Sequence, residues 1–474
     1  MNACHLAALV ASLVVTGCAS TSPRASFEDV ARNVETRSGH KVRWDVDADE
    51  DREARKAVDR LLAGELTADG AVQVALLTSP HLRSKFEELA IAQADLVQAG
   101  LLKNPVFSLG RTAWEAEHIN PNLFATVEQD FLDILTMPMR KRVAATEVEA
   151  TKLDVADEVL QLAAEVREAF FAAQAAEQLV SMRRLVDEMS NVGAELTRRQ
   201  HEAGNVGDLD RDTELVLAAQ TSLDRALAEG DAAVTREKLN KLMGVWGPRT
   251  AWKTAARLPE LPKEEALVEH LESMAIGQRL DVAAARRNVQ AMGYALSLAK
   301  TTRWTGLINV NVEVGRLRHN RRFSFGPSVA IEIPLFDQRQ GQIARLEAFK
   351  RQGDNDLEAL AIDVRADVRS TRARVLTARR VVEQYGNVIV PLRESIVRLS
   401  QERYDSMLIG VFQLIQAKQA EFEAYREYIE ALRDYWIARS DLERAVGGRV
   451  GVKAVGVAVA PAPAVPPPGP HSGH

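Results

Sequence analysis

The chain repeats itself once, and this duplication constrains its fold more than any other feature. Four pairs of matching residues define it, at separations of 203 (410 − 207 and 447 − 244), 204 (332 − 128) and 205 (315 − 110): Gly207 with Gly410, Gly244 with Gly447, Glu128 with Glu332, and Gly110 with Gly315. The register changes ahead of these pairs, where Leu82 to Gly110 covers 28 positions (110 − 82) and Leu280 to Gly315 covers 35 (315 − 280). That difference is one heptad, which would leave the buried face of a helix unchanged. The sequence therefore predicts two copies of one structural unit.

Each copy is expected to contain a helix, two strands, a long helix, a short turn and a second helix. In the first copy, an amphipathic pattern over residues 71–102 precedes the strands, and the long helix is expected over about 141–200. Its end is marked by Gly204-Asn205-Val206-Gly207. In the second copy, the long helix is expected after Pro334-Leu335-Phe336-Asp337 and up to about Tyr404. At ~1.5 Å per residue, each long helix would measure roughly 90 to 100 Å, far more than a helix of an ordinary globular domain.

Apolar residues on the second long helix recur at alternating steps of three and four, which is typical of a coiled coil. The positions are Ala378, Val382, Tyr385, Ile389, Leu392, Ile396 and Leu399. We expect the two helices of one hairpin to bury this stripe between them, with contacts in a wider assembly as an addition.

The stretch Leu307–Leu335 carries the clearest strand signal. Apolar and polar residues alternate on both sides of the basic turn Arg316–Arg322, and a period of two gives each kind its own face of a sheet. A soluble antiparallel sheet could show the same alternation. Here the polar positions are small and hydrophilic, and each strand nears the ~9–11 residues that span a bilayer. The pattern therefore predicts a membrane barrel, whose apolar face meets lipid and whose polar face lines water.

The alternation assigns residues to the two faces. The lipid-facing positions are Ile308, Val310, Val312, Val314, Phe323, Phe325, Val329 and Ile331. The lumen-facing positions are Glu128, Asn309, Asn311 and Glu332. In the first copy Phe107, Leu109, Ala125 and Val127 occupy the positions of Val312, Val314, Val329 and Ile331. In an oligomer, Glu128 and Glu332 could form a ring of carboxylates that favours cations; the alternative is an ordinary polar lining without selectivity.

Four strands are too few to close a barrel. An open sheet edge inside lipid leaves backbone groups unpaired, at several kcal/mol each. The protein must therefore share its barrel with other copies. A wide aqueous lumen needs about twelve strands or more, and three copies would supply twelve, although the residues alone leave two or four copies open.

The N-terminus is typical of an exported protein. The apolar run Leu6–Val15 ends in small residues, like a secretory signal peptide, and is too short for a stable membrane-spanning helix. The segment Val15-Thr16-Gly17-Cys18-Ala19-Ser20 resembles a bacterial lipobox, in which Cys18 would carry lipid. Ala19, rather than Asp, after the cysteine favours the outer membrane. The alternative is an ordinary signal peptide cut near Ala19, because the first five residues lack Lys and Arg.

Composition and motifs argue against an enzyme. The formal net charge of −6 offers no basic surface for nucleic acid. The nine histidines are scattered, without HExxH, paired CxxC or a glycine-rich phosphate loop, so no cofactor and no metal site are expected. Cys4 and Cys18 are the only cysteines, which excludes a disulfide or thiolate site in the body of the chain. Residues 448–474 are rich in Ala and Pro and are expected to be a disordered tail.

Residues from about 70 to 447 resemble the TolC-type outer-membrane efflux factors. Four features carry the resemblance, together with the duplication: Ala99-Gly100-Leu101-Leu102 followed by Asn104-Pro105 before the strands, Pro334-Leu335-Phe336 after them, and the turns at Gly207 and Gly410. The lipid-anchored members for heavy metals or drugs are the most similar. The resemblance implies a mainly α protein with transmembrane β-strands: a homotrimer with a twelve-stranded β-barrel in the outer membrane and a twelve-helix α-barrel in the periplasm. It also implies a periplasmic adaptor and a proton-driven inner-membrane pump, most simply of the RND type, as partners.

The resemblance places a gate at the periplasmic tips of the hairpins. The expected tip residues are Gly207, Asp208, Asp210, Gly410, Gln413 and Gln416. Many family members carry aspartates after the second tip, where this chain has Gln413 and Gln416, so a carboxylate gate is not expected there. At the first tip, the interpretation we favour is that the acidic residues satisfy the start of a helix, since acids are common in a first turn.

The expected organisation is a signal peptide (1–17), a lipid-anchored N-terminal segment (18–70), efflux repeat 1 (71–247), a linker (248–265), efflux repeat 2 (266–447) and the tail (448–474). The expected function is the exit duct of an efflux system. The chief alternative is a periplasmic adaptor lipoprotein, which has one helical hairpin where this chain has two. The sequence does not distinguish metal ions from drugs as cargo.

Overall fold

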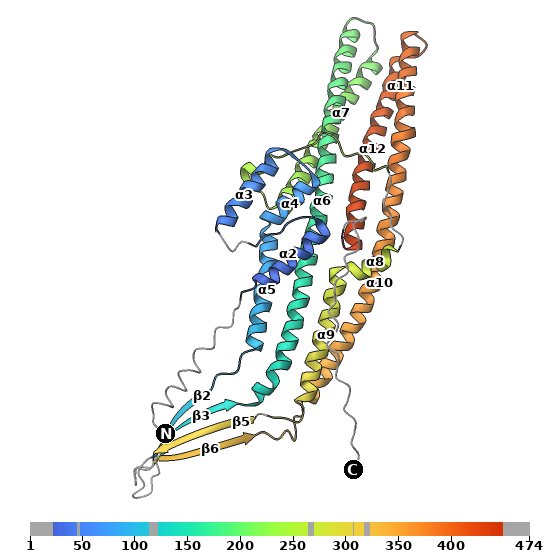
Figure 1. Ribbon diagram of the computed structural model, residues 1–474. Coiled ribbons are helices and arrows are strands. Elements are labelled where there is room, and N and C mark those ends of the chain that lie inside the picture. The colour runs from blue at the N-terminus through green and yellow to red at the C-terminus, as the bar shows by residue number, and fades with distance from the viewer. Residues whose placement is uncertain are drawn as a thin grey trace.

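The structure is a computed structural model that describes residues 22–44, 48–112, 122–263, 270–306, 308–316 and 323–448. The molecule is elongated, with a four-stranded sheet at one end, two long helical hairpins whose tips lie at the other, and small N-terminal helices on the flank (Figure 1). The predicted lipidation site Cys18, the predicted signal peptide and the Pro-rich tail lie outside the described residues.

The two copies have the same order of elements, as the duplication predicts. The first copy consists of α4 (Ala68–Thr78), α5 (Pro80–Ala99), β2 (Val106–Thr112), β3 (Asn122–Asp130), α6 (Leu132–Glu202) and α7 (Asp208–Met243). The second consists of α8 (Leu271–Gln278), α9 (Leu280–Thr301), β5 (Ile308–Arg316), β6 (Phe323–Ile331), α10 (Gln340–Gln384), a π-helical turn (Tyr385–Ile389), α11 (Val390–Asp405) and α12 (Val411–Val446).

Two predicted helix boundaries are wrong. The amphipathic pattern over 71–102 is two helices, because Ser79 before Pro80 is extended (φ −60°, ψ 116°) and starts α5 as its N-cap. The long helix α6 begins at Leu132 rather than near residue 141 and runs through Pro138. The one-heptad difference between the copies is also wrong. Helix α5 starts 30 residues before Gly110 (110 − 80) and α9 starts 35 before Gly315 (315 − 280), so the difference is five.

The four strands form one antiparallel sheet with the order β2-β3-β5-β6. The pair β3 and β5 joins the first copy to the second, with Glu128 opposite Asn311 and Val127 opposite Val312. The strands β2 and β6 are the two edges of this sheet. Each therefore has backbone groups along one side that no strand of the same sheet pairs.

The N-terminal segment and the linker form part of the core, which the sequence did not predict. On the flank of the bundle, helix α2 (Arg24–Ser38) packs against α6 and α5, and helix α3 (Ala48–Ala63) lies beside α4 (Figure 1). Trp44 packs with Phe27 and Phe86, with the ring centres of Phe27 and Phe86 5.1 Å apart. Strand β1 (Glu65–Leu66) pairs in parallel with β4 (Lys253–Thr254) of the linker. The N-terminal segment is thereby fastened to the middle of the hairpins.

Trp252 anchors the linker beside β4. Its side chain is buried, and its Nε1 donates to Asn240 Oδ1 at 2.7 Å. The guanidinium of Arg236 lies 3.7 Å from the centre of its ring, a distance that suits a cation–π contact. The linker is thus packed against α7 over this stretch and is more than a connector.

The predicted coiled-coil stripe is only half buried within one chain. Val382, before the π-helical turn, is buried, whereas Leu392, Ile396 and Leu399, after it, are exposed. A π-helical turn adds a residue to one turn of a helix, so the side chains that follow are rotated away from the earlier face. The expectation that the hairpin buries the whole stripe is therefore wrong beyond the turn.

The ends of α7 and α12 show the duplication in three dimensions. Each helix ends at a glycine in the left-handed region, Gly244 (φ 65°) and Gly447 (φ 86°). A Cβ atom on Gly244 would lie 3.2 Å from Cα of Ser79, and one on Gly447 would lie 3.1 Å from Cα of Arg279. Ser79 and Arg279 are the residues that precede α5 and α9. In both copies the end of the last helix therefore packs against the start of the helix that precedes the strands, α5 in the first copy and α9 in the second.

We expect Gly244→Ala and Gly447→Ala each to lower the free energy of unfolding by about 1–3 kcal/mol, because alanine is strained in the left-handed region and meets backbone there. The measurement is helical ellipticity against temperature for the purified protein. Gly230→Ala is the matched control, since Gly230 lies inside α7 with no atom within 4 Å of an added Cβ, and it should stabilise slightly. Equal unfolding temperatures for all three variants would contradict the cap argument.

Candidate functional site

The strand register divides the sheet into two faces. Glu128 lies opposite Asn311, and Asn311 lies opposite Ser328, so these three residues share one face. Asn309, two positions from Asn311, is on the same face. The other face carries the apolar positions Phe107, Leu109, Ala125, Val127, Ile308, Val310, Val312, Val314, Phe325, Val329 and Ile331. Which face meets lipid remains a prediction.

Two predicted face residues lie at the limits of the sheet. Glu332 follows the last residue of β6, and its backbone lies against Gly306. Phe323 pairs with Arg316 in the backbone register, and its side chain lies outside the described residues. The polar face thus has Glu128, Asn309 and Asn311 within the strands, with Glu332 just beyond them.

The polar side chains of this face contact one another. Asn309 Nδ2 donates to Glu128 Oε1 at 2.5 Å, across β3 and β5. Asn311 Oδ1 is buried and has no hydrogen-bond partner within the described part of the chain. This cluster offers carboxylate and amide oxygens, which are the ligands that hard cations prefer.

The polar face also carries an aromatic residue that the sequence analysis missed. Phe124 lies opposite Gly110, and its ring occupies the space that a side chain on Gly110 would need. An aromatic ring over a glycine of the neighbouring strand protects that part of the ladder. The sequence could have shown this, because Phe124 is an even number of residues from Glu128 in the same strand and so shares its face.

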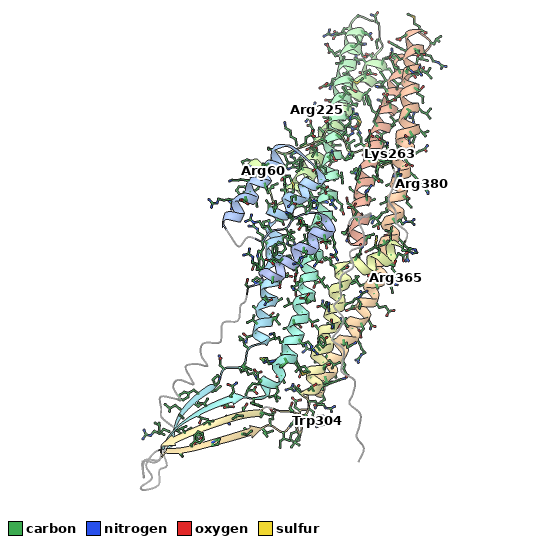
Figure 2. The ribbon with its side chains drawn as sticks, in the orientation of Figure 1. Arg60, Arg225, Lys263, Trp304, Arg365 and Arg380 are labelled. Atoms are coloured by element: carbon green, nitrogen blue, oxygen red, sulfur yellow. The ribbon has the colours of Figure 1, made fainter. Side chains whose placement is uncertain are left out.

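Exposed apolar residues gather where the helices meet the sheet. Trp304 lies at this junction, with the guanidinium of Arg303 4.8 Å from the centre of its ring (Figure 2). Phe336 is 92% exposed, and Leu335 and Phe131 are also exposed. Tryptophan and other aromatic residues are common at the boundary between lipid and water. From the sequence, Leu335 and Phe336 were expected only as the end of the strands, and neither Trp304 nor Phe131 was given a role.

The hairpin tips have the same backbone conformation in both copies. Gly207 precedes α7 (φ −75°, ψ 168°) and Gly410 precedes α12 (φ −80°, ψ 161°), each extended and without a side-chain cap. Both tips lie at the end of the molecule far from the sheet (Figure 1). Gln413 and Gln416 are exposed on the first turns of α12.

Acidic residues at the first tip pair with a neighbouring arginine. Asp208 lies 2.9 Å and Asp212 2.8 Å from the guanidinium of Arg211. The hydrogen bond from Arg211 keeps the pKa of Asp212 below its usual value. His201 also contacts this group, with its Nε2 2.8 Å from Nη1 of Arg211, while its Nδ1 lies 2.9 Å from the carbonyl oxygen of Val206. These local pairs suit acids that stabilise the start of a helix.

Helix α12 packs against both α6 and α10, so the two copies meet along a seam in the middle of the molecule. Arg167 of α6 lies 3.2 Å from Glu443 of α12, and Arg374 of α10 lies 3.0 Å from Asp441 of α12. Glu168 lies beside Asp441. Its partial burial, the hydrogen bond with Asp441 and the charge of Asp441 raise the pKa of Glu168 to about 7.

Neither a membrane-spanning helix nor a metal cluster is present in the described residues. Within the described ranges, no helix is both long and apolar enough to cross a bilayer. In the same ranges, no three His, Cys, Asp or Glu side chains are grouped to hold a metal ion.

Comparison with known proteins agrees with these features. Residues 271–448 match the family of outer membrane efflux proteins. The cobalt-zinc-cadmium resistance protein CzcC of Cupriavidus metallidurans is 21% identical over 395 residues, which cover 82% of this chain and 91% of CzcC. A membrane protein of Pseudomonas aeruginosa has a similar structure, with a TM-score of 0.69, 18% identity, and coverage of 87% of this chain and 95% of that one. The transmembrane channel protein CusC follows with a TM-score of 0.67, 15% identity, and coverage of 81% and 92%.

The fold is the one found in subunits of outer-membrane channels. The second copy carries the match to the outer membrane efflux proteins, and the described fold resembles that of TolC-like outer-membrane channels such as CusC, as the sequence predicted. This is a family of transport channels rather than of enzymes. The comparisons support the channel and do not support the periplasmic adaptor.

The Glu168 pair predicts how stability depends on pH. In the folded state the pKa of Glu168 is raised above the usual value of 4.5 to about 7. The stabilisation of the fold by protonated Glu168 is therefore fully present below pH ~4.5 and is lost as the pH rises through 7. Glu168→Gln keeps a neutral side chain at every pH. We therefore expect this variant to unfold at a higher temperature than the natural protein at pH 8 and at a similar one at pH 5.

Glu165→Gln on the same helix is the control, since Glu165 instead accepts a hydrogen bond from Gln161 at 3.0 Å. It should leave the pH dependence unchanged. If Glu168→Gln and Glu165→Gln give the same pH profile, the seam does not titrate as described.

Proposed function

We propose that this protein is the outer-membrane exit duct of a tripartite efflux system, working as a homotrimer. The sheet with one apolar face and two open edges carries this proposal. Backbone groups at an edge cannot stay unpaired in lipid, so β6 of one copy must pair with β2 of the next. Three copies close a barrel of twelve strands, enough for an aqueous lumen.

The assignment of the two faces follows from the surroundings of such a barrel. The apolar set that includes Val312, Val329 and Ile331 meets lipid, and the polar set with Glu128, Asn309 and Asn311 lines the lumen. Trp304 and Phe336, where the strands meet the helices, would lie at the periplasmic boundary of the membrane. Lipid on Cys18 would add a second attachment to the same membrane.

The hairpins supply the periplasmic part of the duct. Each leaves apolar side chains exposed in the single chain, among them Leu209, Val216 and Leu223 on α7 and Leu392, Ile396 and Leu399 on α11. Long amphipathic helices with such unpartnered positions are stabilised by lateral packing against further helices. Neighbouring copies and a periplasmic adaptor are the partners that this supports, and an inner-membrane pump, of the RND type, supplies the energy.

We infer that the cargo is a metal cation. The relative CzcC is named for resistance to cobalt, zinc and cadmium. Oxygen donors on the polar face, Glu128 with Asn309 and Asn311, suit weak and reversible contact with a passing cation.

A charged residue on each face tests the barrel. Val329→Lys should reduce the yield of the heat-modifiable trimer in outer-membrane fractions, because a lysine on the lipid face costs about 2–4 kcal/mol at the middle of a bilayer. Ser328→Lys, the adjacent position on the polar face, should leave the trimer yield near that of the natural protein. The reverse order would exchange the two faces. A detergent-independent, soluble monomer that does not conduct ions in a planar bilayer would refute the proposed function.

We expect the residues at the two hairpin tips to restrict the passage of ions only weakly. Asp210→Ala combined with Gln413→Ala should raise the single-channel conductance in a planar bilayer only modestly, by less than about twofold, because acids at a helix start mainly stabilise that helix. The double variant Glu53→Ala with Gln178→Ala, remote from the tips, is the control. A severalfold rise for the tip variant alone would show that Asp210 and Gln413 close the duct.

A further inference from the structure

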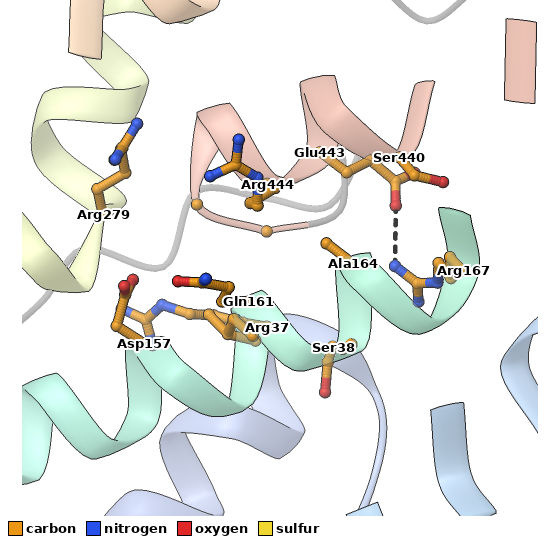
Figure 3. A pocket seen from close by; sticks show the side chains of 14 residues that line it. Arg37, Ser38, Asp157, Gln161, Ala164, Arg167, Arg279, Ser440, Glu443 and Arg444 are labelled. Carbon is orange, nitrogen blue, oxygen red and sulfur yellow. Dashed lines mark hydrogen bonds and ion pairs between the residues drawn. The ribbon is translucent and has the colours of Figure 1, made fainter. Parts of the chain in front are cut away.

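A small pocket lies on the seam between the two copies, at the middle of the molecule. Its walls come from the end of α2, from α6, from the start of α9 and from the end of α12 (Figure 3). The cavity volume is about 50 Å³. Since a single water needs about 10–15 Å³ on this measure, there is room for a group of roughly three to five heavy atoms.

Arg37, the next-to-last residue of α2, is buried in this wall with only 6% of its surface exposed. Its Nη1 donates to Asn33 Oδ1 at 3.0 Å. Its Nε and Nη2 are buried and have no hydrogen-bond partner within the described residues. A guanidinium is always charged in proteins, and a buried charge without a partner costs several kcal/mol. An anion in the pocket would remove most of this cost.

The carboxylates around the pocket are already engaged elsewhere. Glu443 lies 3.2 Å from Arg167, and Asp281 lies 2.6 Å from Arg279. Asp157 also lines the pocket; its burial raises its pKa to about 6, and the arginine whose charge acts on it is Arg279 rather than Arg37. The lining thus has more positive than negative charge: Arg37, Arg167, Arg279 and Arg444 against Asp157 and Glu443.

Two other occupants are less suited to the pocket. Residues 449–474, which follow Gly448 in the pocket wall, contain no Asp or Glu side chain. A neighbouring copy would join through the sheet edges β2 and β6, whereas all the walls of this pocket belong to one chain, at the seam between its own two halves. A small soluble anion meets both the size and the charge of the site.

We propose that the pocket binds a small oxyanion, a carboxylate or a phosphate, whose oxygens accept hydrogen bonds from Nε and Nη2 of Arg37. A guanidinium presents paired N–H groups in the spacing of such an anion. The bound anion ties the end of α2 to α6 and α12, and so fastens the N-terminal segment to the seam. This site does not depend on the conduction of solutes.

The test uses the full-length protein purified in detergent, titrated with sodium phosphate and separately with sodium acetate at an ionic strength held constant with NaCl. At least one of the two should give saturable heat in calorimetry, near one site per chain, and raise the unfolding temperature of the helices by about 1–3 °C at saturation. Phosphate alone or acetate alone would identify which oxyanion the pocket takes.

Arg37→Met should abolish both responses, and in NaCl alone it should unfold at or above the temperature of the natural protein, because the unpaired charge is gone. Arg37→Lys, which keeps the charge without the paired N–H groups, should bind at least tenfold more weakly. Arg32→Met, an exposed arginine of α2 paired with Asp29 at 3.6 Å, should respond like the natural protein. The proposal is overturned if neither anion binds saturably, or if Arg37→Met keeps the response.

Discussion

The unpaired backbone at the edges of the sheet is the constraint on which the rest of this structure depends. Strands β2 and β6 each have one side that no strand of the same sheet pairs. In water such an edge is tolerable, but in lipid each unsatisfied N–H or C=O group costs several kcal/mol. A chain with four strands and one apolar face is therefore incomplete alone. Assembly is a condition for inserting this sheet into a membrane.

The helices have a related requirement. Their apolar positions are shared between the partner within a hairpin and surfaces that stay exposed in the single chain, such as Leu392 and Leu399 beyond the π-helical turn. Because helices of this length gain most of their stability from lateral packing, exposed apolar positions point to further helices around the duct. The sheet and the helices thus both leave surfaces open to further strands and helices, which is consistent with the proposed tube that continues from one to the other.

The middle of the molecule has a different character, since there the chain packs against itself. The linker contributes Trp252, the N-terminal segment contributes Trp44, and both are buried. Ion pairs such as Arg167 with Glu443 join the two copies along α6 and α12. This region also contains two ionisable side chains away from water: Glu168 is partly buried, which raises its pKa, and Arg37 is buried.

The sequence by itself determined the duplication, the two faces of the sheet, the long hairpins and the resemblance to outer-membrane efflux channels. These follow from local periodicity and from matched positions such as Gly207 and Gly410, which need no knowledge of what packs against them. Only the tertiary structure decided that α6 continues through Pro138 and that the stripe is exposed beyond a π-helical turn. It also decided that Trp252 and Arg37 are buried. The reason is that burial depends on residues far away in the chain, and those contacts leave no periodic signal in the residues themselves.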